Sequence, residues 1–340
     1  MGLSLIEQPL IWKMLMTMDI ETMAGTTALI TGIAGFTGLH LARLLLSKGL
    51  KVIGIDRAGV SSPIKGIADV RLIHIDLLDR EAVAHVIAET RPALIFHLAG
   101  LIRSSDLAAL LSLNVQATEH VLAAAEALVP LPRVFIAGSA AEYGLIDPTM
   151  LPVDEEMIPR PITYYGVSKL AQTALSIARY FEVGLPVYVG RLFNVVGPGE
   201  PDSAFCGAMA RQVAAIGLGL QEPVLRTGNL TSMRDFLDIR DAVSAYWAIM
   251  TRGSPGRIYN VCSGIPLALT DVPPLLLDLA DISARLVTEP ARVQRTDVPC
   301  SYGNSSRLRS ETGWIPRYML AVSLADLLAD WRNRLLEAQK

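Results

Sequence analysis

The sequence predicts an α/β protein with a doubly wound parallel sheet and a smaller C-terminal α/β lobe. From residue 28 onwards, short apolar runs rich in β-forming residues alternate with helical segments, an order typical of a parallel sheet covered by helices. Several runs are continuously apolar, as strands buried on both faces should be. The predicted strands are Ala28–Thr31, Val52–Asp56, Leu72–Asp76, Leu94–Ala99, Val134–Ser139 and Val187–Phe193.

Helical patterns lie between these strands. After about residue 195, glycine and proline become frequent and the regular alternation weakens. We therefore predict an N-terminal extension over residues 1–24, a sheet domain over 25–194 to which later segments return, and a second lobe over 195–340. The predicted helices are Leu39–Lys48, Glu81–Glu89, Asn114–Ala127 and Lys169–Tyr180.

Composition excludes several classes of protein. The 340 residues carry 30 Lys and Arg against 33 Asp and Glu, without long runs of one sign, which argues against a nucleic-acid partner. Cys206, Cys262 and Cys300 are far apart, so we expect neither a metal site nor a disulfide framework, and we expect a cytoplasmic protein. The apolar stretch Leu10–Met16 is too short to span a bilayer and lacks a cleavage site, so no membrane association is expected.

A glycine motif follows the first predicted strand and opens the first predicted helix. Gly32, Gly35 and Gly38 form the pattern G-x-x-G-x-x-G, with Phe36 and Thr37 inside it. Glycines at these positions permit a tight turn and bring backbone N–H groups close to a pyrophosphate at the positive end of a helix. The motif predicts a Rossmann-type dinucleotide site that includes all five residues.

Acidic residues at the next two strand ends predict the remainder of the coenzyme site. Asp56 is placed to accept hydrogen bonds from a ribose 2′-hydroxyl and to repel a 2′-phosphate, which slightly favours NAD. Arg57 follows directly and offers a partner for that phosphate, so NADP stays open. Asp76 and Leu77 are placed to meet the adenine, or alternatively they form the N-cap region of the helix Glu81–Glu89.

Tyr165 and Lys169 are candidate catalytic residues. Side chains four positions apart share one face of a helix, and an ammonium there can lower the pKa of the phenol and help it to exchange a proton. Ser139 lies 26 positions upstream, at the end of an apolar run. A Tyr and a Lys at this spacing are most often a solvated surface pair; the preceding nucleotide motif is what favours catalysis.

With these elements in order, the chain resembles the extended short-chain dehydrogenase/reductase family of nucleotide-sugar epimerases, dehydratases and reductases. The likeness covers about residues 26–335, and beyond the glycine motif it rests on His97–Gly100, Asn114, Gly138–Gly144, Tyr165 with Lys169, and Arg191–Gly199. The second half is most similar to GDP-4-keto-6-deoxy-D-mannose reductases, which form GDP-D-rhamnose. That similarity rests on Gly199–Ser203, Ala210–Val213, Gly228–Leu230, Arg234–Asp238, Tyr259–Gly264 and Thr312–Trp314.

The resemblance implies an activity and roles for single residues. It implies a reductase in which NAD(P)H delivers a hydride to a 4-keto sugar, Tyr165 protonates the oxygen, Ser139 hydrogen-bonds to it, and Lys169 binds the nicotinamide ribose. The lobe over 195–340 then mainly binds substrate. Besides Tyr165 and Lys169, the implied coenzyme contacts are Leu98, Ala99, Gly100, Asn114 and Leu192.

The substrate residues predicted here are mostly cationic, because a nucleoside diphosphate needs positive partners. Arg234 and Arg295 match family positions that hold the diphosphate, and Arg211 is a weaker candidate; surface ion pairs are the alternative for each. Asn194 is expected to present its amide to the substrate or else to cap a strand. Leu101 and its neighbour Ile102 replace the small polar residues of relatives, which leaves the sugar specificity open.

Other functions are weighed against the same residues. Ala141 stands where dehydratases carry an acid, and Glu142 should point elsewhere, so a 4,6-dehydratase is disfavoured. A UDP-hexose-type 4-epimerase with bound NAD uses the same Ser, Tyr and Lys and is the main alternative. A non-catalytic NAD(P)-binding sensor or scaffold is the alternative of another class. By resemblance we expect a homodimer formed through Asn114–Ala127 and Lys169–Tyr180, and we interpret His97 as structural.

Overall fold

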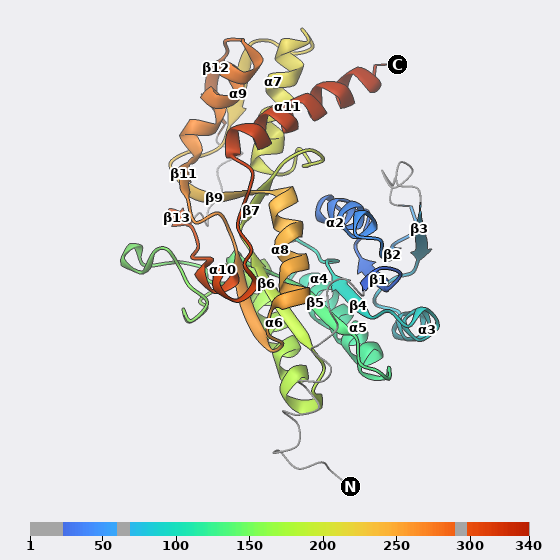
Figure 1. Ribbon diagram of the computed structural model, residues 1–340. Helices are drawn as coiled ribbons and strands as arrows, with labels where there is room; N and C mark the ends of the chain where they lie inside the picture. Colours follow the sequence, from blue (N-terminus) through green and yellow to red (C-terminus); the bar gives the residue numbers. More distant parts are fainter. Residues whose placement is uncertain (1–22, 60–68, 290–297, 340) are drawn as a thin grey trace.

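The computed structural model describes residues 23–59, 69–289 and 298–339. At its centre is a seven-stranded sheet in the order β10-β6-β5-β4-β1-β2-β3, in which every neighbouring pair is parallel (Figure 1). From the central strand β1, the chain first adds β2 and β3 on one side of the sheet. It then returns to the other side of β1 and adds β4, β5, β6 and β10 there. The strands are β1 Thr27–Thr31, β2 Lys51–Asp56, β3 Val70–His74, β4 Leu94–His97, β5 Arg133–Ser139, β6 Val187–Leu192 and β10 Arg257–Val261.

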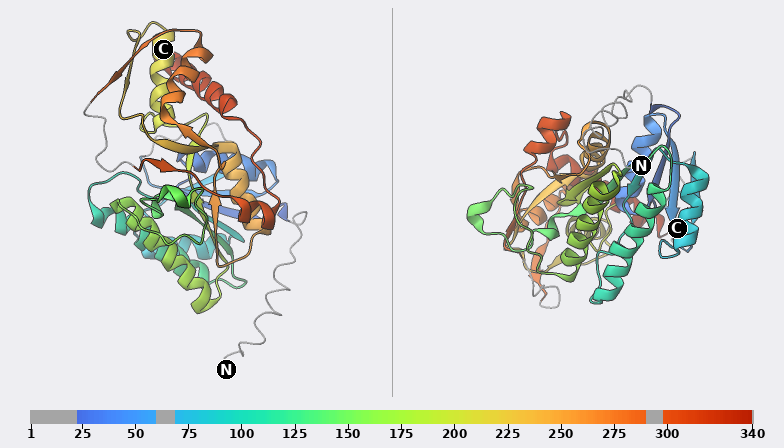
Figure 2. Two further views of the ribbon diagram at one scale, coloured as in Figure 1. Left: turned by 90° about the vertical axis from the view of Figure 1, so that its left-hand side faces the viewer. Right: turned by 90° about the horizontal axis from the view of Figure 1, so that it is seen from below.

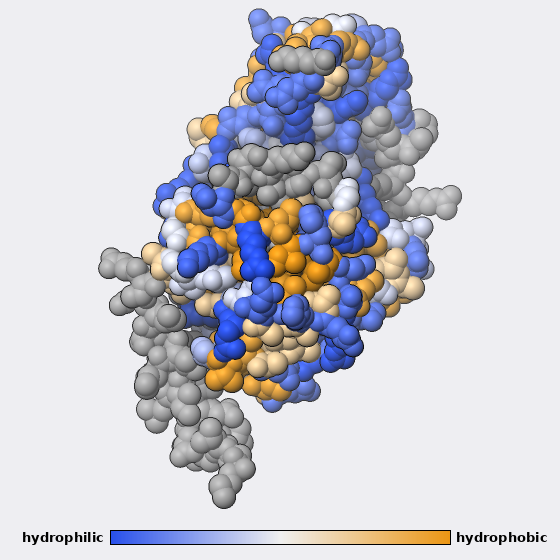
Figure 3. Space-filling view, turned by 90° about the vertical axis from the view of Figure 1, so that its right-hand side faces the viewer, coloured by the Kyte–Doolittle hydropathy of each residue, from blue (hydrophilic) through white to orange (hydrophobic). Residues whose placement is uncertain are grey.

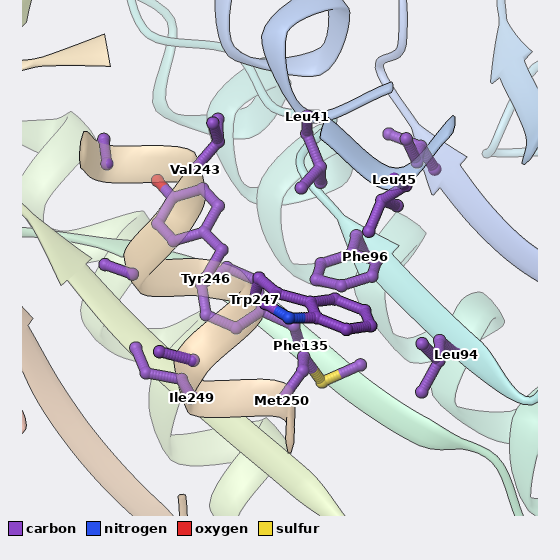
Figure 4. Close-up of a cluster of buried hydrophobic side chains, with 14 of the residues drawn as sticks. Leu41, Leu45, Leu94, Phe96, Phe135, Val243, Tyr246, Trp247, Ile249 and Met250 are labelled. Atoms are coloured by element: carbon purple, nitrogen blue, oxygen red, sulfur yellow. The ribbon is translucent and has the colours of Figure 1, made fainter. Parts of the chain in front are cut away.

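Helices cover both faces of this sheet. On one face lie α3 Arg80–Thr90, α5 Ala117–Glu126 and α6 Tyr164–Val183; on the other lie α2 Phe36–Ser47 and α8 Ile239–Arg252. Alternate residues of each strand enter the two cores, and on the α2–α8 side Phe135 packs 4.3 Å, between ring centroids, from Tyr246 (Figure 4). The prediction of a doubly wound parallel sheet is confirmed.

The second half of the chain builds a smaller lobe. Its helices pack around a separate apolar core at the end of the molecule away from α5 and α6 (Figures 1 and 2). Three elements beyond residue 195, α8, β10 and α10 Ser306–Thr312, complete the sheet domain instead. The lobe contains β7 Asn194–Val196, α7 Phe205–Gly217, β8 Val224–Thr227, β9 Met233–Asp238, β11 Pro266–Ala268, α9 Val272–Ala280, β12 Arg285–Thr288, β13 Cys300–Ser301 and α11 Leu320–Glu337.

Three helix starts differ from the predictions. Helix α2 begins at Phe36, three residues before the predicted Leu39. The predicted helix Asn114–Ala127 is preceded by α4, Leu107–Leu111, and the two are joined by a π-helical turn at Ser112–Gln116 that turns Asn114 into the interior. The helix predicted from Lys169 begins earlier, at Tyr164, because the Thr163 hydroxyl accepts a hydrogen bond from the Gly166 N–H. Tyr165 therefore lies in the first turn of α6.

β3 forms an edge of the sheet. Figure 3 faces this side of the molecule, where hydrophobic surface in orange is interrupted by hydrophilic residues in blue. Arg71 on β3 pairs with Glu89 at 2.8 Å, and charges on an edge strand oppose pairing with another sheet. Of the extension predicted over 1–24, only Met23 and Ala24 are described, and Met23 is buried in the α2–α8 core. Among the described helices, none combines the length and apolarity needed to cross a membrane.

Candidate active site

A cavity of about 1280 Å³ lies where the carboxyl ends of the central strands meet the lobe. In an open α/β sheet this edge, at the reversal of strand order, is where ligands bind. Nearly every residue predicted for the site lines the cavity: Gly32, Gly35, Phe36, Thr37, Gly38, Asp56, Arg57, Asp76, Leu77, Leu98, Ala99, Gly100, Asn114, Ser139, Tyr165, Lys169, Leu192, Asn194 and Arg234.

The glycine turn forms a cradle that side chains would fill. Gly32 has φ +70°, and a Cβ there would lie 2.8 Å from the Ala99 Cα; a Cβ on Gly38 would lie 2.4 Å from the Gly32 carbonyl oxygen. Helix α2 starts immediately after this turn, with neither a capping side chain nor an acidic residue in its first turn. Its N–H groups and positive dipole end are therefore available to an anion, which fits the pyrophosphate of a dinucleotide.

Asp56 joins β2 to the glycine turn. One carboxylate oxygen accepts from the Ala34 N–H and the other from the Arg57 N–H, each at 2.9 Å. Asp76 accepts from the Leu78 N–H at 2.9 Å, whereas the cap of α3 is Asp79. Asp76 thus remains beside the cavity and does not cap the helix.

Asn114, predicted as a coenzyme contact, lines the cavity and also has protein partners. Its Oδ1 accepts from the Leu101 N–H at 2.7 Å, and its Nδ2 donates to the Leu101 carbonyl and to the Ser168 hydroxyl, both at 2.9 Å. The buried amide thereby ties the loop after β4 to α6. In this structure its side chain shapes the cavity wall through protein contacts.

Ser139 and Tyr165 meet where β5 ends and α6 begins. The Ser139 hydroxyl accepts from the Ala141 N–H at 3.1 Å and also hydrogen-bonds to the Tyr165 phenol. Burial raises the pKa of Tyr165, and the bond to Ser139 opposes that rise. The phenol is therefore protonated near neutral pH.

Lys169 is 5% exposed, and burial lowers its pKa to about 8, against the opposing charge of Glu142. Its ammonium donates to the Ala137 carbonyl and to the Gln172 side-chain oxygen. The pKa of the Tyr165 phenol is raised in the protein alone, because burial dominates it and the Lys169 ammonium is directed at these two acceptors; the lowering by Lys169 stays a prediction.

Glu142 forms a buried ion pair with Arg191 at 2.8 Å, and it also accepts from the Ser139 N–H at 2.8 Å. The Arg191 guanidinium lies 4.7 Å from the centre of the Tyr143 ring. The carboxylate is therefore held behind Ser139, as expected from its sequence position. Ala141 offers no group that could act as a base.

The predicted substrate residues have different outcomes. The Asn194 amide donates to the Asp235 carbonyl at 3.1 Å at the cavity wall, and Arg234 donates to the Val298 carbonyl at 2.6 Å. Arg211 is not among the cavity-lining residues, and its Nε lies 3.7 Å from Asp202, which does line the cavity; its role as a substrate ligand stays a prediction beside the ion-pair alternative. Arg295 lies outside the described residues.

The structure adds cavity residues to which the sequence assigned no role: Arg103, Glu200, Arg226, Asn229 and Tyr246. Arg103 donates to the Ser203 carbonyl and so connects the loop after β4 to the lobe. Tyr246 comes from α8, and its hydroxyl is buried without a hydrogen-bond partner among the described residues. In Figure 4 this hydroxyl, in red, points away from the apolar cluster that holds the ring.

The fold and the site define an NAD(P)-dependent oxidoreductase with a Rossmann domain. A family model described as the NAD dependent epimerase/dehydratase family matches residues 28–262, and the chain belongs to this family. The GDP-6-deoxy-D-mannose reductase of Pseudomonas aeruginosa is 34% identical over 91% of this chain and 98% of its own length. The dTDP-6-deoxy-L-talose 4-dehydrogenase of Kitasatospora kifunensis is 26% identical over 88% and 93%.

Solved structures agree with this assignment. RMD from Pseudomonas aeruginosa, complexed with NADPH, has a TM-score of 0.79 and 32% identity, covering 91% of this chain and 99% of its own. The UDP-glucose 4-epimerase of Thermus thermophilus with NAD has a TM-score of 0.81 at 24% identity, covering 90% and 99%, and shows the shared fold. The resemblance predicted from the sequence is confirmed.

We expect the substitution Tyr246→Phe to raise the stability of the coenzyme-free protein and to weaken coenzyme binding. A buried hydroxyl without a partner costs about 1–3 kcal/mol, and the cavity beside Tyr165 is the place for a partner from a bound ligand. Urea unfolding and NADPH fluorescence titration measure the two effects. Tyr143→Phe is the matched control: it removes a satisfied bond of 2.7 Å to Asn260 and should lower stability. A loss of stability in Tyr246→Phe would contradict the assignment.

Proposed function

We propose that the protein is a nucleotide-sugar 4-ketoreductase that reduces GDP-4-keto-6-deoxy-D-mannose to GDP-D-rhamnose with NAD(P)H. The observation that carries the proposal is the arrangement of Ser139, Tyr165 and Lys169 at one cavity with the glycine turn. The 34% identical relative, a GDP-6-deoxy-D-mannose reductase, supports the choice of sugar and nucleotide.

The chemistry follows from the side chains present. A reduced nicotinamide supplies the hydride for the carbonyl carbon when it is bound. Tyr165 would give its proton to the oxygen that becomes the hydroxyl, and its raised pKa keeps that proton in place beforehand. Ser139 would donate a hydrogen bond to the same oxygen as charge develops. Lys169 would hold the coenzyme ribose.

Cations on the lobe suit a nucleoside diphosphate. Arg234 and Arg226 both line the cavity, and guanidinium groups bind phosphate oxygens in bidentate fashion. Arg226 is exposed at the cavity and is paired with Glu222 and Glu289 at 2.8 and 3.1 Å, which fixes its position. We propose Arg234 as a diphosphate ligand and retain Arg295 as a prediction for the same role.

A 4-epimerase is the second candidate, because a UDP-glucose 4-epimerase of Mycolicibacterium smegmatis is 26% identical over 90% of the chain. An epimerase keeps its coenzyme and shows no net oxidation, which separates the two activities. A non-catalytic sensor is less consistent with the intact set of Ser139, Tyr165 and Lys169. The three cysteines are free thiols, which is consistent with a reducing compartment such as the cytoplasm.

The test of the function mixes the protein with GDP-4-keto-6-deoxy-D-mannose and NADPH or NADH and follows coenzyme absorbance and product identity. We expect coenzyme oxidation with formation of GDP-D-rhamnose. Tyr165→Phe should lower turnover by about 10²–10⁴-fold, the contribution of a general acid, and leave coenzyme affinity nearly unchanged. Interconversion of a UDP-hexose without net oxidation would replace the proposal with the epimerase.

We further propose that NAD(H) is slightly preferred, because the Asp56 carboxylate lines the cavity beside the glycine turn and would meet the coenzyme ribose there. The variant Asp56→Asn keeps an oxygen for the Ala34 N–H and removes the charge. It should improve NADPH affinity relative to NADH by about tenfold, the scale of one charge repulsion near a protein surface. Fluorescence titration with both coenzymes measures the ratio. RMD from Pseudomonas aeruginosa was solved with NADPH. A strong preference of the unmodified protein for NADPH over NADH would reverse the proposal.

We also propose a homodimer through the outer face of α6. This face is apolar while the inner face is polar; Val167 is 40% exposed and Phe181 is 76% exposed. A second copy of the chain would cover such a stripe. Most of α5 is already buried, so α4 with its exposed Leu111 is the neighbour of α6 in this surface.

A charge in this stripe should separate the protomers. Val167→Glu is expected to convert a dimer into a monomer in sedimentation analysis, because a carboxylate would be buried without a partner. Glu182→Ala, near the end of the same helix, is the control and should stay dimeric. A monomeric unmodified protein at micromolar concentration would exclude the dimer.

A further inference from the structure

The buried face of α6 is polar, whereas the buried face of a helix is normally apolar. Ser168, Lys169, Gln172, Thr173 and Ser176 are all buried there. Buried polar groups persist where they are hydrogen-bonded. Beyond Lys169, the mechanism gives no part to these groups.

Thr118 on α5 fixes the directions of the bonds in this layer. Its hydroxyl has one hydrogen and donates it to the Asn114 carbonyl at 2.7 Å. Towards Gln172 Nε2, at 2.7 Å, and His97 Nε2, at 2.9 Å, the same oxygen can only accept. His97 therefore carries its proton on Nε2, and its Nδ1 accepts from the Thr31 hydroxyl at 2.8 Å.

His97 stays neutral in this position. Burial lowers its pKa to about 3, and nearby Lys169 acts in the same direction. Both ring nitrogens have protein partners and the ring is fully buried, which agrees with the structural role predicted for it. The tautomer is thus held by Thr31 on one side and Thr118 on the other.

The orientation of the Gln172 amide follows from this arrangement. Its NH₂ group must face Thr118, which has no hydrogen left to donate, and so its oxygen must face the Lys169 ammonium, as it does. The opposite orientation would place amide N–H groups against the ammonium. An amide does not relay protons, so Gln172 holds Lys169 in place and does not exchange a proton with it.

We propose that Gln172 is a positioning residue for Lys169, with its amide oriented by Thr118 and His97, and that it presents the ammonium to the coenzyme ribose. An ammonium has three N–H donors. Two of them are directed at Ala137 and Gln172, and the third is left for the cavity that Lys169 lines. The inference concerns coenzyme binding and is independent of which sugar is reduced.

Other ionisable groups surround Lys169 and must be held constant in a test. Glu142 raises the pKa of Lys169 and is itself paired with Arg191 from β6. Tyr165 precedes it on α6, and His97 from β4 is neutral. The variants below substitute none of these groups, and Thr118→Val additionally removes the acceptor of the His97 Nε2–H.

The test compares Gln172→Met and Gln172→Glu by titrating NADPH fluorescence over a range of pH. Gln172→Met keeps the length of the side chain and loses the acceptor. We expect NADPH affinity to fall by about tenfold or more, the effect of one hydrogen bond to a charged group. Affinity should also be lost at alkaline pH as Lys169 loses its proton, and in this variant that loss should occur about one pH unit lower. Gln172→Glu should move that loss to higher pH, because a carboxyl stabilises the ammonium.

A second pair of variants, at Thr118, separates the effect of the Gln172 amide orientation from an effect on the stability of the fold. Thr118→Val removes the hydroxyl that accepts from the Gln172 amide and should shift the pH profile of NADPH affinity downward, as Gln172→Met does. Thr118→Ser keeps a hydroxyl and should give the profile of the unmodified protein. Ser176→Ala removes a hydrogen bond to the backbone carbonyl of Gln172, not to its side-chain amide, and should leave the pH profile unchanged. An unchanged profile in Gln172→Met, or shifts of the same sign in Gln172→Met and Gln172→Glu, would overturn the proposal.

Discussion

The buried ammonium of Lys169 is the constraint on which much of the site depends. Removing a charge from water is costly unless it is hydrogen-bonded and compensated. Here one acceptor comes from the end of β5 and another from the next turn of α6, while Glu142 supplies nearby negative charge. The position of α6 against β5 therefore decides whether Lys169 is tolerated at all.

This constraint connects the two faces of the sheet. On the α6 side, the polar layer of Gln172, Thr118 and His97 reaches Thr31, whose hydroxyl also accepts from the Ala99 N–H at 3.3 Å. Ala99 in turn forms the backbone surface against which Gly32 closes. The bonds that anchor the lysine thus continue into the wall of the glycine turn, so the catalytic end and the phosphate end of the cavity share one framework.

Much of the fold and the coenzyme site could be predicted, because each depends on local pattern. The glycine motif lies between a strand and a helix, and Asp56 ends the second strand, so strand order alone places them together. Arg211 could not be judged in this way, since its direction on α7 depends on packing that its own segment does not encode. The raised pKa of Tyr165 could not be predicted, because burial of the phenol is a tertiary property. Tyr246 reaches the cavity only because α8, far along the chain, returns to cover the sheet.

The protonation of Tyr165 bears on the choice between reduction and epimerisation. An epimerase must first remove a proton from a sugar hydroxyl, so it requires the phenolate at the start, and the positive charge of an oxidised nicotinamide favours that form. A reductase starts from the neutral, reduced ring and needs the phenol to keep its proton until the ketone oxygen takes it. In this structure burial raises the pKa of Tyr165, and the lysine ammonium is held by Ala137 and Gln172. Both features stabilise the protonated phenol, which is the form from which a reductase starts.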